Sequence, residues 1–292
     1  MKIPRGLQPL LDDGAIDGVV GALKSGKEAS VYLVRVGGGV QCAKVYKEAS
    51  QRAFRSAAQY QEGRKHRGSR EQRAMGKRSR FGREEQESSW KNAEVEALFR
   101  LSGAGLRVPR PYGVYDGVLL MELVTDAEGY PAPRLNDVLL EPEQAREWHA
   151  ILLNQVVRML CAGMIHGDLS EYNVLAGAHG PVIIDLPQAV DAAGNNNAFA
   201  MLARDVNNLR GYFSRFAPEL AETEHAHEIW KLYQARELRP DSTLTGRFIH
   251  DTRRANVGAV MYEIDEARKE AEARERGRIA AEGGEGSSPR KG

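Results

Sequence analysis

The feature that most constrains this chain is the run at residues 166–173, His-Gly-Asp-Leu-Ser-Glu-Tyr-Asn, together with a second aspartate at short range. Asp168 and Asn173 lie inside the run, and Asp185 ends the apolar stretch Ile183-Ile184, twelve residues after Asn173. A lone His-x-Asp is common, but the full octet followed by an apolar strand ending in Asp seldom arises by chance. Carboxylate and amide oxygens are the donors that Mg²⁺ prefers. The fold must therefore bring a loop and a strand end into one site.

The octet matches the H-x-D-L-x-x-x-N catalytic loop of protein kinases. Phosphoryl transfer there needs one carboxylate to accept or orient a hydroxyl proton, and an amide oxygen plus another carboxylate to hold Mg²⁺. The sequence therefore predicts Asp168 as the catalytic acid–base group and Asn173 and Asp185 as metal ligands. The alternative is that Asp168 and Asn173 only cap turns, as most Asp and Asn in loops do. His166 is expected to be structural, because the mechanism assigns it no proton.

Lys44 lies in the strand-like run at residues 40–46, which resembles the Val-Ala-Ile-Lys segment of kinases. A lysine within an apolar strand is expensive to bury unless an anion meets it. The α- and β-phosphates of ATP would be that anion. Glu94, on a helix expected at 89–101, is the predicted partner of the ammonium group, and Glu96 is the competing choice. The alternative is an edge-strand lysine that points into water.

Residues 21–28, Gly-Ala-Leu-Lys-Ser-Gly-Lys-Glu, differ by one residue from a Walker A loop. Glu28 stands where a Ser or Thr hydroxyl should ligate Mg²⁺, and residues 29–36 continue as a strand rather than a helix. A phosphate-covering turn between two strands fits better, although Gly26 is its single central glycine. A Walker-type NTPase is therefore the weakest function considered.

The order of elements, with strands first and helices later, predicts an α+β fold of two lobes with a cleft between them. Alternation and turn residues predict the strands, and apolar spacing predicts the helices. The expected elements are a short helix or turn at 14–23, strands at 30–36, 40–46 and 181–185, a hairpin at 114–123, and helices at 143–162, 198–216 and 219–237.

We divide the chain into four parts on the same pattern. Their expected limits are an N-terminal extension at 1–22, an N-lobe at 23–123, a C-lobe at 124–257, and a charged helix with a tail at 258–292. Within the N-lobe, residues 50–88 lose all apolar periodicity and are expected to be a mobile loop.

Charge is unevenly distributed behind the net value of +1. Residues 51–83 hold 11 Lys and Arg against two acids, so this basic loop carries +9 and the remainder of the chain carries −8. Clustered cations neutralise RNA phosphates, which makes RNA one possible partner. The other interpretation is a solvated loop that carries autophosphorylation sites such as Ser56, Ser69 or Ser79.

Two cysteines, Cys42 and Cys161, cannot form a disulfide framework, and both have apolar neighbours in the sequence. We expect buried thiols in a reducing compartment. No apolar run approaches the 18 residues of a membrane span, and the N-terminus lacks the apolar core of a secretion signal. The expectation is a cytoplasmic globular protein.

From about residue 23 to about residue 216 the chain resembles the RIO-type atypical protein kinases. Gly167, where ordinary kinases carry arginine, and Gln188-Ala189-Val190 after the metal aspartate match this family better than ordinary kinases. The segments that carry the resemblance are 25–32, 43–47, 119–122, 166–173 and 183–190. The N-terminal extension is too short for the winged helix of one subfamily, so the chain resembles the subfamily without it, or a bacterial relative.

The resemblance implies a small bilobal kinase fold whose C-lobe is truncated and mostly helical. It implies binding of ATP with Mg²⁺ or Mn²⁺, and autophosphorylation on serine. It also implies that a nucleotide loop contacts the phosphates through backbone N–H groups and that a hinge segment contacts adenine. The positions concerned are Ser25, Gly26, Lys27, Glu28, Ala29 and Ser30 in the loop, and Met121, Glu122 and Val124 in the hinge.

Three functions follow from these expectations. The first is an ATP-dependent, Mg²⁺-requiring serine/threonine protein kinase that acts at least on itself. The second is an ATPase switch in maturation of the small ribosomal subunit, which would pass through a phospho-aspartate at Asp185. The third is a nucleotide-binding scaffold without turnover, against which the complete set Lys44, Asp168, Asn173 and Asp185 argues.

Overall fold

The computed structural model describes residues 3–26, 29–47 and 93–249. Residues Met1–Phe248 form one compact unit and Ile249–Gly292 another, and every element named below belongs to the first. The basic loop and the charged helix expected from residue 258 lie outside the described residues. The four-part division of the chain stays a prediction.

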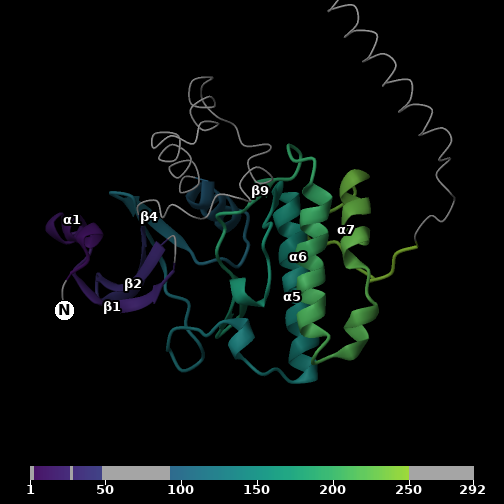
Figure 1. Ribbon diagram of the computed structural model, residues 1–292, viewed down its shortest axis with the longest axis horizontal. Coiled ribbons are helices and arrows are strands. Elements are labelled where there is room, and N and C mark those ends of the chain that lie inside the picture. The colour runs from purple at the N-terminus through teal and green to yellow at the C-terminus, as the bar shows by residue number, and fades with distance from the viewer. Residues whose placement is uncertain (1–2, 27–28, 48–92, 250–292) are drawn as a thin grey trace, which may run out of the picture. The chain divides into compact units, whose positions relative to one another are not determined.

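Five antiparallel strands form the sheet of the N-lobe, in the order β1-β2-β3-β5-β4 (Figure 1). The bounds are β1 Gly18–Ser25, β2 Ala29–Val36, β3 Gly39–Tyr46, β4 Pro111–Tyr115 and β5 Val118–Glu122. The two expected hairpins, β2–β3 and β4–β5, are confirmed. Gly37 and Gly38 join the first pair with φ of 56° and 84°, a conformation that glycine adopts without a steric penalty.

The N-terminal residues cover one face of this sheet. A 3₁₀ turn, η1 Arg5–Leu7, leads into the short helix α1 Gln8–Asp12. Leu7 and Leu10 pack with Val34, Ala43 and other buried residues of the sheet. The expected helix or turn at 14–23 is wrong for most of its length, because residues from Gly18 onward pair with β2 as strand β1. Cross-strand pairing outweighs the weak local preference of that segment.

Three helices lie side by side in the C-lobe (Figure 1). They are α5 Pro142–Cys161, α6 Ala198–Phe213 and α7 His225–Gln234. The first two match the expected helices, whereas the segment 219–237 forms a 3₁₀ turn, η4 Pro218–Glu222, before α7 begins. The apolar stripe of α5 contributes eight buried residues to the main core.

Short strands and turns connect these helices to the site. A further helix spans residues 93–103, within the region where one was expected. The remaining elements are β6 Met164–Ile165 paired with β9 Val190–Asp191, β7 Val174–Gly177 paired with β8 Gly180–Ile183, and the 3₁₀ turns η2 Leu135–Asp137 and η3 Glu171–Asn173. The expected α+β fold is therefore confirmed.

The two cysteines differ in environment. Cys42 is buried, as expected, and burial together with the charge of Glu122 raises its pKa to about 12. The expectation of a second buried thiol is wrong, because Cys161 is exposed. Val157 and Leu160 lie on the buried stripe of α5, and Cys161, one residue on, turns to the outside. Among the described residues, none of the helices combines the length and apolar character needed to cross a membrane.

His149 of α5 makes the C-lobe core sensitive to acid. The side chain is 2% exposed and packs against the rings of Phe213 and His225, with centroids 5.5 and 5.6 Å away. Its Nε2 has no hydrogen-bond partner among the described residues. Burial, assisted by His225, lowers the pKa of His149 to about 4. The unfolded chain therefore binds more protons between about pH 4 and 6.5, so this group's contribution to stability is lost as the pH falls through that window.

Between pH 7 and pH 5, we expect the unfolding free energy of the wild type to fall by about 2 kcal/mol more than that of His149→Phe. Phenylalanine keeps a ring in this aromatic cluster and removes the proton site. Urea unfolding at both pH values gives the measurement. Taking the difference between the two proteins cancels the opposite contribution of Asp205, whose pKa is raised. Parallel pH profiles for the two proteins would contradict the assignment.

Candidate active site

A cavity of about 580 Å³ is lined by residues of both lobes. This volume is within the usual range of small-molecule sites, about 300–1,000 Å³. Predicted site residues on its wall are Gly26, Ala29, Lys44, Glu94, Met121, Glu122, Val124, Asp168 and Asp185. Ser25, Ser30 and Asn173 are not wall residues, and Lys27 and Glu28 lie outside the described residues.

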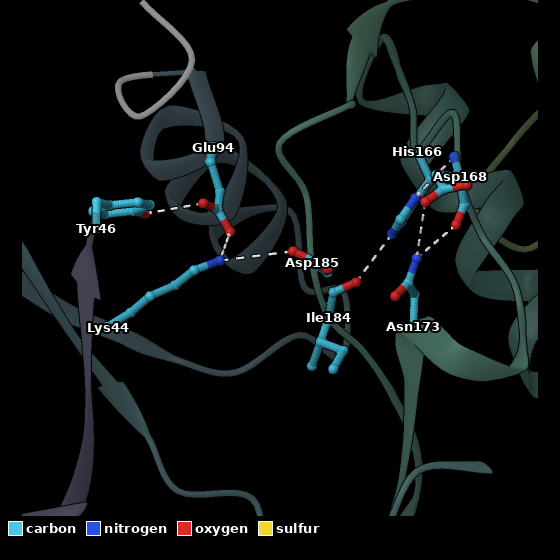
Figure 2. Close-up of polar contacts among 8 residues, drawn as sticks. All are labelled: Lys44, Tyr46, Glu94, His166, Asp168, Asn173, Ile184 and Asp185. Atoms are coloured by element: carbon cyan, nitrogen blue, oxygen red, sulfur yellow. Dashed lines mark hydrogen bonds and ion pairs between the residues drawn. The ribbon is translucent and has the colours of Figure 1, made fainter. Parts of the chain in front are cut away.

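Lys44 joins the two lobes at this cavity (Figure 2). Its Nζ donates a hydrogen bond to Glu94 Oε1 and lies 3.7 Å from Asp185 Oδ1. The Lys44 side chain is 14% exposed and that of Glu94 8% exposed, so each charge would be costly to bury alone. The predicted choice of Glu94 over Glu96 agrees with this pair, and the water-facing alternative for Lys44 is wrong.

Tyr46 gives Glu94 a second hydrogen bond. Its hydroxyl donates to Glu94 Oε2 at 3.0 Å, while Oε1 accepts from Lys44 (Figure 2). Burial, followed by the negative charge of Glu94, raises the pKa of Tyr46, so the hydroxyl keeps its proton. Both carboxylate oxygens of Glu94 are therefore held by residues of β3.

The catalytic-loop octet is held together by His166 and Asn173 (Figure 2). The Asp168 N–H donates to His166 Nδ1 at 3.3 Å, so Nε2 carries the proton and donates to the Ile184 carbonyl at 3.1 Å. Asn173 Nδ2 donates to the Asp168 carbonyl at 2.8 Å and to its Oδ2 at 3.3 Å. Both imidazole nitrogens thus bind backbone groups, in agreement with the structural role expected for His166.

Three side chains of α6 fix the backbone on either side of Asp168. Asp205 accepts hydrogen bonds from the N–H groups of Gly167 and Leu169 at 2.8 and 2.9 Å. Arg204 donates to the Gly167 carbonyl, and Asn208 donates to the Leu169 carbonyl at 2.9 Å. Gly167 has a φ of 79°, which disfavours any residue with a side chain. The loop geometry thus favours glycine at this position.

Asp205 is the main functional residue that the sequence interpretation missed. It is 2% exposed, and burial raises its pKa to about 6 against the opposing effects of His166, its two backbone hydrogen bonds and Arg204. A signal did exist, since Asp205 falls within the apolar stripe of α6, between the buried Leu202 and Leu209. A carboxylate on the buried face of a helix needs hydrogen-bond donors, but the sequence did not show which ones.

Asp185, which lines the cavity, and Asn173, which does not, both carry oxygen donors. The Asp185 side chain is 45% exposed, and its backbone has a φ of 68°, a left-handed conformation that is unusual for a residue other than glycine. With its nitrogen bound to Asp168, the Asn173 amide turns its oxygen toward the side where Asp185 lies (Figure 2). Carboxylate and amide oxygens of this kind suit Mg²⁺ or Mn²⁺.

The described residues on either side of the nucleotide loop, Ser25–Gly26 and Ala29–Ser30, contact one another. The Gly26 N–H donates to the Ala29 carbonyl at 2.9 Å, and Ser25 Oγ lies 3.1 Å from Ser30 Oγ. The Gly26 N–H is therefore already used and is not open to a phosphate in this arrangement. Because the turn joins two strands, the Walker-type alternative is wrong.

Backbone groups of the hinge differ in their hydrogen bonding. The Glu122 N–H donates to the Arg110 carbonyl at 2.8 Å, and the Val124 carbonyl accepts from the Ala132 N–H at 2.9 Å. The Val124 N–H has no hydrogen-bond partner within the described part of the chain. Met121 and Val124 both line the cavity.

The Glu122 side chain has a structural role. Arg107 donates two hydrogen bonds to its carboxylate, each of 2.8 Å, and the Arg110 N–H donates a third at 3.0 Å. Although burial opposes the change, these bonds hold the pKa of Glu122 below its ordinary value. The Glu122 carboxylate is thus held by Arg107 and Arg110.

The comparisons with known proteins agree with this geometry. A family model described as RIO domain matches residues 30–226. The chain belongs to the RIO family. Among curated RIO proteins, it is 35% identical over 211 residues to the RIO-type serine/threonine-protein kinase Rio1 of Haloferax volcanii. It is 30% identical over 208 residues to the serine/threonine-protein kinase RIO1 of Homo sapiens, and 30% identical over 197 residues to the RIO-type serine/threonine-protein kinase Rio1 of Methanocaldococcus jannaschii.

The extent of these RIO matches differs between relatives. About 70% of this chain aligns with the Haloferax volcanii and human proteins and 67% with the Methanocaldococcus jannaschii protein. The aligned region spans 67%, 35% and 63% of those relatives, respectively. The chain therefore matches only about a third of the human RIO protein.

Proposed function

We propose that this RIO-family chain is an ATP-dependent serine/threonine protein kinase that phosphorylates at least itself. One observation carries the proposal: Lys44 lies between Glu94 and Asp185 on the wall of the cavity that Asp168 also lines. A cation beside two carboxylates at a cavity with an apolar wall is the arrangement that phosphoryl transfer requires. The printed names of the relatives, which call them serine/threonine-protein kinases, support the same activity.

ATP would bind with its adenine beside Met121 and the hinge. The free N–H of Val124 offers a hydrogen bond to the adenine edge, and the β1–β2 turn would lie over the phosphates. Lys44 would meet the α- and β-phosphates, since Glu94, which Tyr46 holds in place, binds its ammonium group from the other side. Preorganised charge of this kind stabilises a transition state without reorganisation during the reaction.

Asn173 and Asp185 would hold Mg²⁺, or Mn²⁺ in its place. Such an ion, when bound, neutralises charge on the β- and γ-phosphates. The donor set fits, because it consists of hard oxygens and the Asp185 carboxylate is partly exposed within the cavity. Lys44 at 3.7 Å from Asp185 leaves room for that carboxylate to turn toward a ligand.

Asp168 would act as the acid–base group. As a serine or threonine oxygen forms its bond to the γ-phosphorus, the bond from that phosphorus to the β–γ bridging oxygen breaks. The hydroxyl proton passes to the Asp168 carboxylate, and ADP leaves. The hydrogen bonds from Asn173 and the anchoring of residues 167 and 169 by α6 keep this carboxylate in place.

A second candidate is an ATPase that passes through a phospho-aspartate at Asp185. The observation that favours it is the position of this carboxylate, which lines the cavity and is nearly half exposed. In that case the γ-phosphoryl group would move to an Asp185 oxygen and water would then release it. This candidate includes RNA or ribosomal particles as partners of the basic loop, which lies outside the described residues. A cytoplasmic location is proposed for either function.

Incubation with γ-labelled ATP and Mg²⁺ distinguishes these functions. For a kinase, we expect label on serine or threonine that resists hydroxylamine, located by mass spectrometry. Label that hydroxylamine removes, located at Asp185, would favour the ATPase. ATP binding without label or hydrolysis, with either Mg²⁺ or Mn²⁺, would contradict both and leave the scaffold.

A further inference from the structure

Lys47 contacts the β1–β2 turn, although the mechanism above gives it no part. Its Nζ donates a hydrogen bond to the Gly26 carbonyl at 2.7 Å and another to Ser25 Oγ at 2.9 Å. Lys47 is exposed and directly follows the last residue of β3. Contacts of an exposed lysine contribute little to the stability of a protein. We therefore look for the role of Lys47 in the residues that it holds in place.

The register of the sheet explains how Lys47 reaches the turn. Tyr46 is the last residue of β3 and pairs with Ala29, the first residue of β2. Lys47 therefore lies one step beyond the paired region, where the chain of β2 gives way to the turn. Lys44 and Tyr46 share the opposite set of strand positions and line the cavity. Residues at the end of β3 thus line the cavity, and the next residue, Lys47, contacts Ser25 and Gly26.

The two ends of the turn are held by a small network. Ser25 Oγ accepts from Lys47 and lies 3.1 Å from Ser30 Oγ, so it links both strands. The Gly26 N–H is bound to the Ala29 carbonyl and the Gly26 carbonyl to Lys47. Both backbone groups of this wall residue are therefore fixed before any ligand enters.

We propose that Lys47 is a positioning residue that holds Ser25 and Gly26, at the end of β1 and beside the cavity, in the arrangement that receives the polyphosphate of ATP. The inference rests on the proposed nucleotide-binding function and adds a residue to it. Residues that are held in place in advance lose less conformational freedom when the ligand binds, so affinity rises without a new contact to the ligand. Loss of Lys47 should weaken the binding only of ligands that carry phosphates, because adenine would bind at the hinge.

The test measures dissociation constants of ATP and adenosine by titration calorimetry. For Lys47→Met we expect ATP to bind about 5- to 10-fold more weakly, with adenosine unchanged within about twofold and the melting temperature unaltered. Lys47→Arg, which keeps a charged donor, should restore most of the affinity for ATP. Arg35→Met is the matched control, because Arg35 is an exposed cation on β2 and is not on the cavity wall.

A double-mutant cycle with Ser25→Ala separates positioning from direct attraction. If Lys47 acts through the turn, the two substitutions should be clearly non-additive for ATP binding. Additive effects, or an effect of Lys47→Met no larger than that of Arg35→Met, would overturn the inference. Should Lys47→Met fail to fold, Ser25→Ala alone must weaken ATP and spare adenosine. A wild type that binds neither ligand would instead refute the proposed function.

Discussion

Replacing Asp168 with asparagine is expected to lower phosphoryl transfer by about 10²- to 10⁴-fold while ATP still binds. Asparagine keeps the shape of the side chain and an oxygen to accept from Asn173, so the loop should stay in place. It cannot take up the hydroxyl proton. The loss should therefore appear in kcat, with little change in the KM for ATP, as expected for an interaction made mainly in the transition state.

Glu171→Gln provides the matched control for this experiment. It makes the same chemical change three residues further along the octet, at a side chain that does not line the cavity. Labelled product per unit time, with the modified residues located by mass spectrometry, is the measurement for both variants. Equal rates for the wild type and Asp168→Asn would refute the assignment of Asp168, whereas equal losses in both variants would indicate general damage to the loop.

Replacing Asp205 with alanine is expected to destabilise the fold by about 2–5 kcal/mol, because two buried N–H groups lose their acceptor. The raised pKa of Asp205 shows that the carboxylate itself is costly to bury, and its removal offsets part of the loss. Transfer should fall by about 10²-fold even where the variant is folded, because Asp168 lies between the two freed residues, and small displacements of a reacting group are costly.

Asp191→Ala is the control for Asp205→Ala. Asp191 also accepts two backbone hydrogen bonds, each of 2.9 Å, from Ala193 and Gly194, but it is only partly buried. We expect a loss of about 1 kcal/mol and unchanged transfer. Urea unfolding gives the stabilities, and the activity of each variant is measured well below its unfolding midpoint. A folded Asp205→Ala protein with wild-type activity would show that α6 does not position the loop.

The sequence was sufficient for those parts of the site that depend on local spacing. Asp168 and Asn173 lie five residues apart, and the structure joins them directly through the Asn173 amide. The strand pattern around Lys44 was equally clear, because the two segments on either side of the glycines at 37–39 are rich in Val and Tyr. Choosing Glu94 over Glu96 needed only the expected helix, and the ion pair with Lys44 agrees with that choice.

Contacts over long sequence separations were not predictable in the same way. Asp205 lies 38 residues after Gly167, and nothing near it in the sequence names its hydrogen-bond donors. Strand β1 was missed because its apolar residues acquire their strand conformation from pairing with β2. Cys161 was assigned to the core because its neighbours are apolar, but one step along a helix rotates a side chain by about 100°.

The alternation along β3 has a consequence for misfolding. Lys44 lines the cavity, while its neighbour Ala43 is fully buried against Leu7 and Leu10 under the N-terminal helix. A slip of β3 by one residue would exchange these faces and place an ammonium group in that apolar layer. Such a sheet would lose its apolar core and would no longer place Lys44 at the cavity. An incorrectly aligned molecule would therefore be both unstable and inactive.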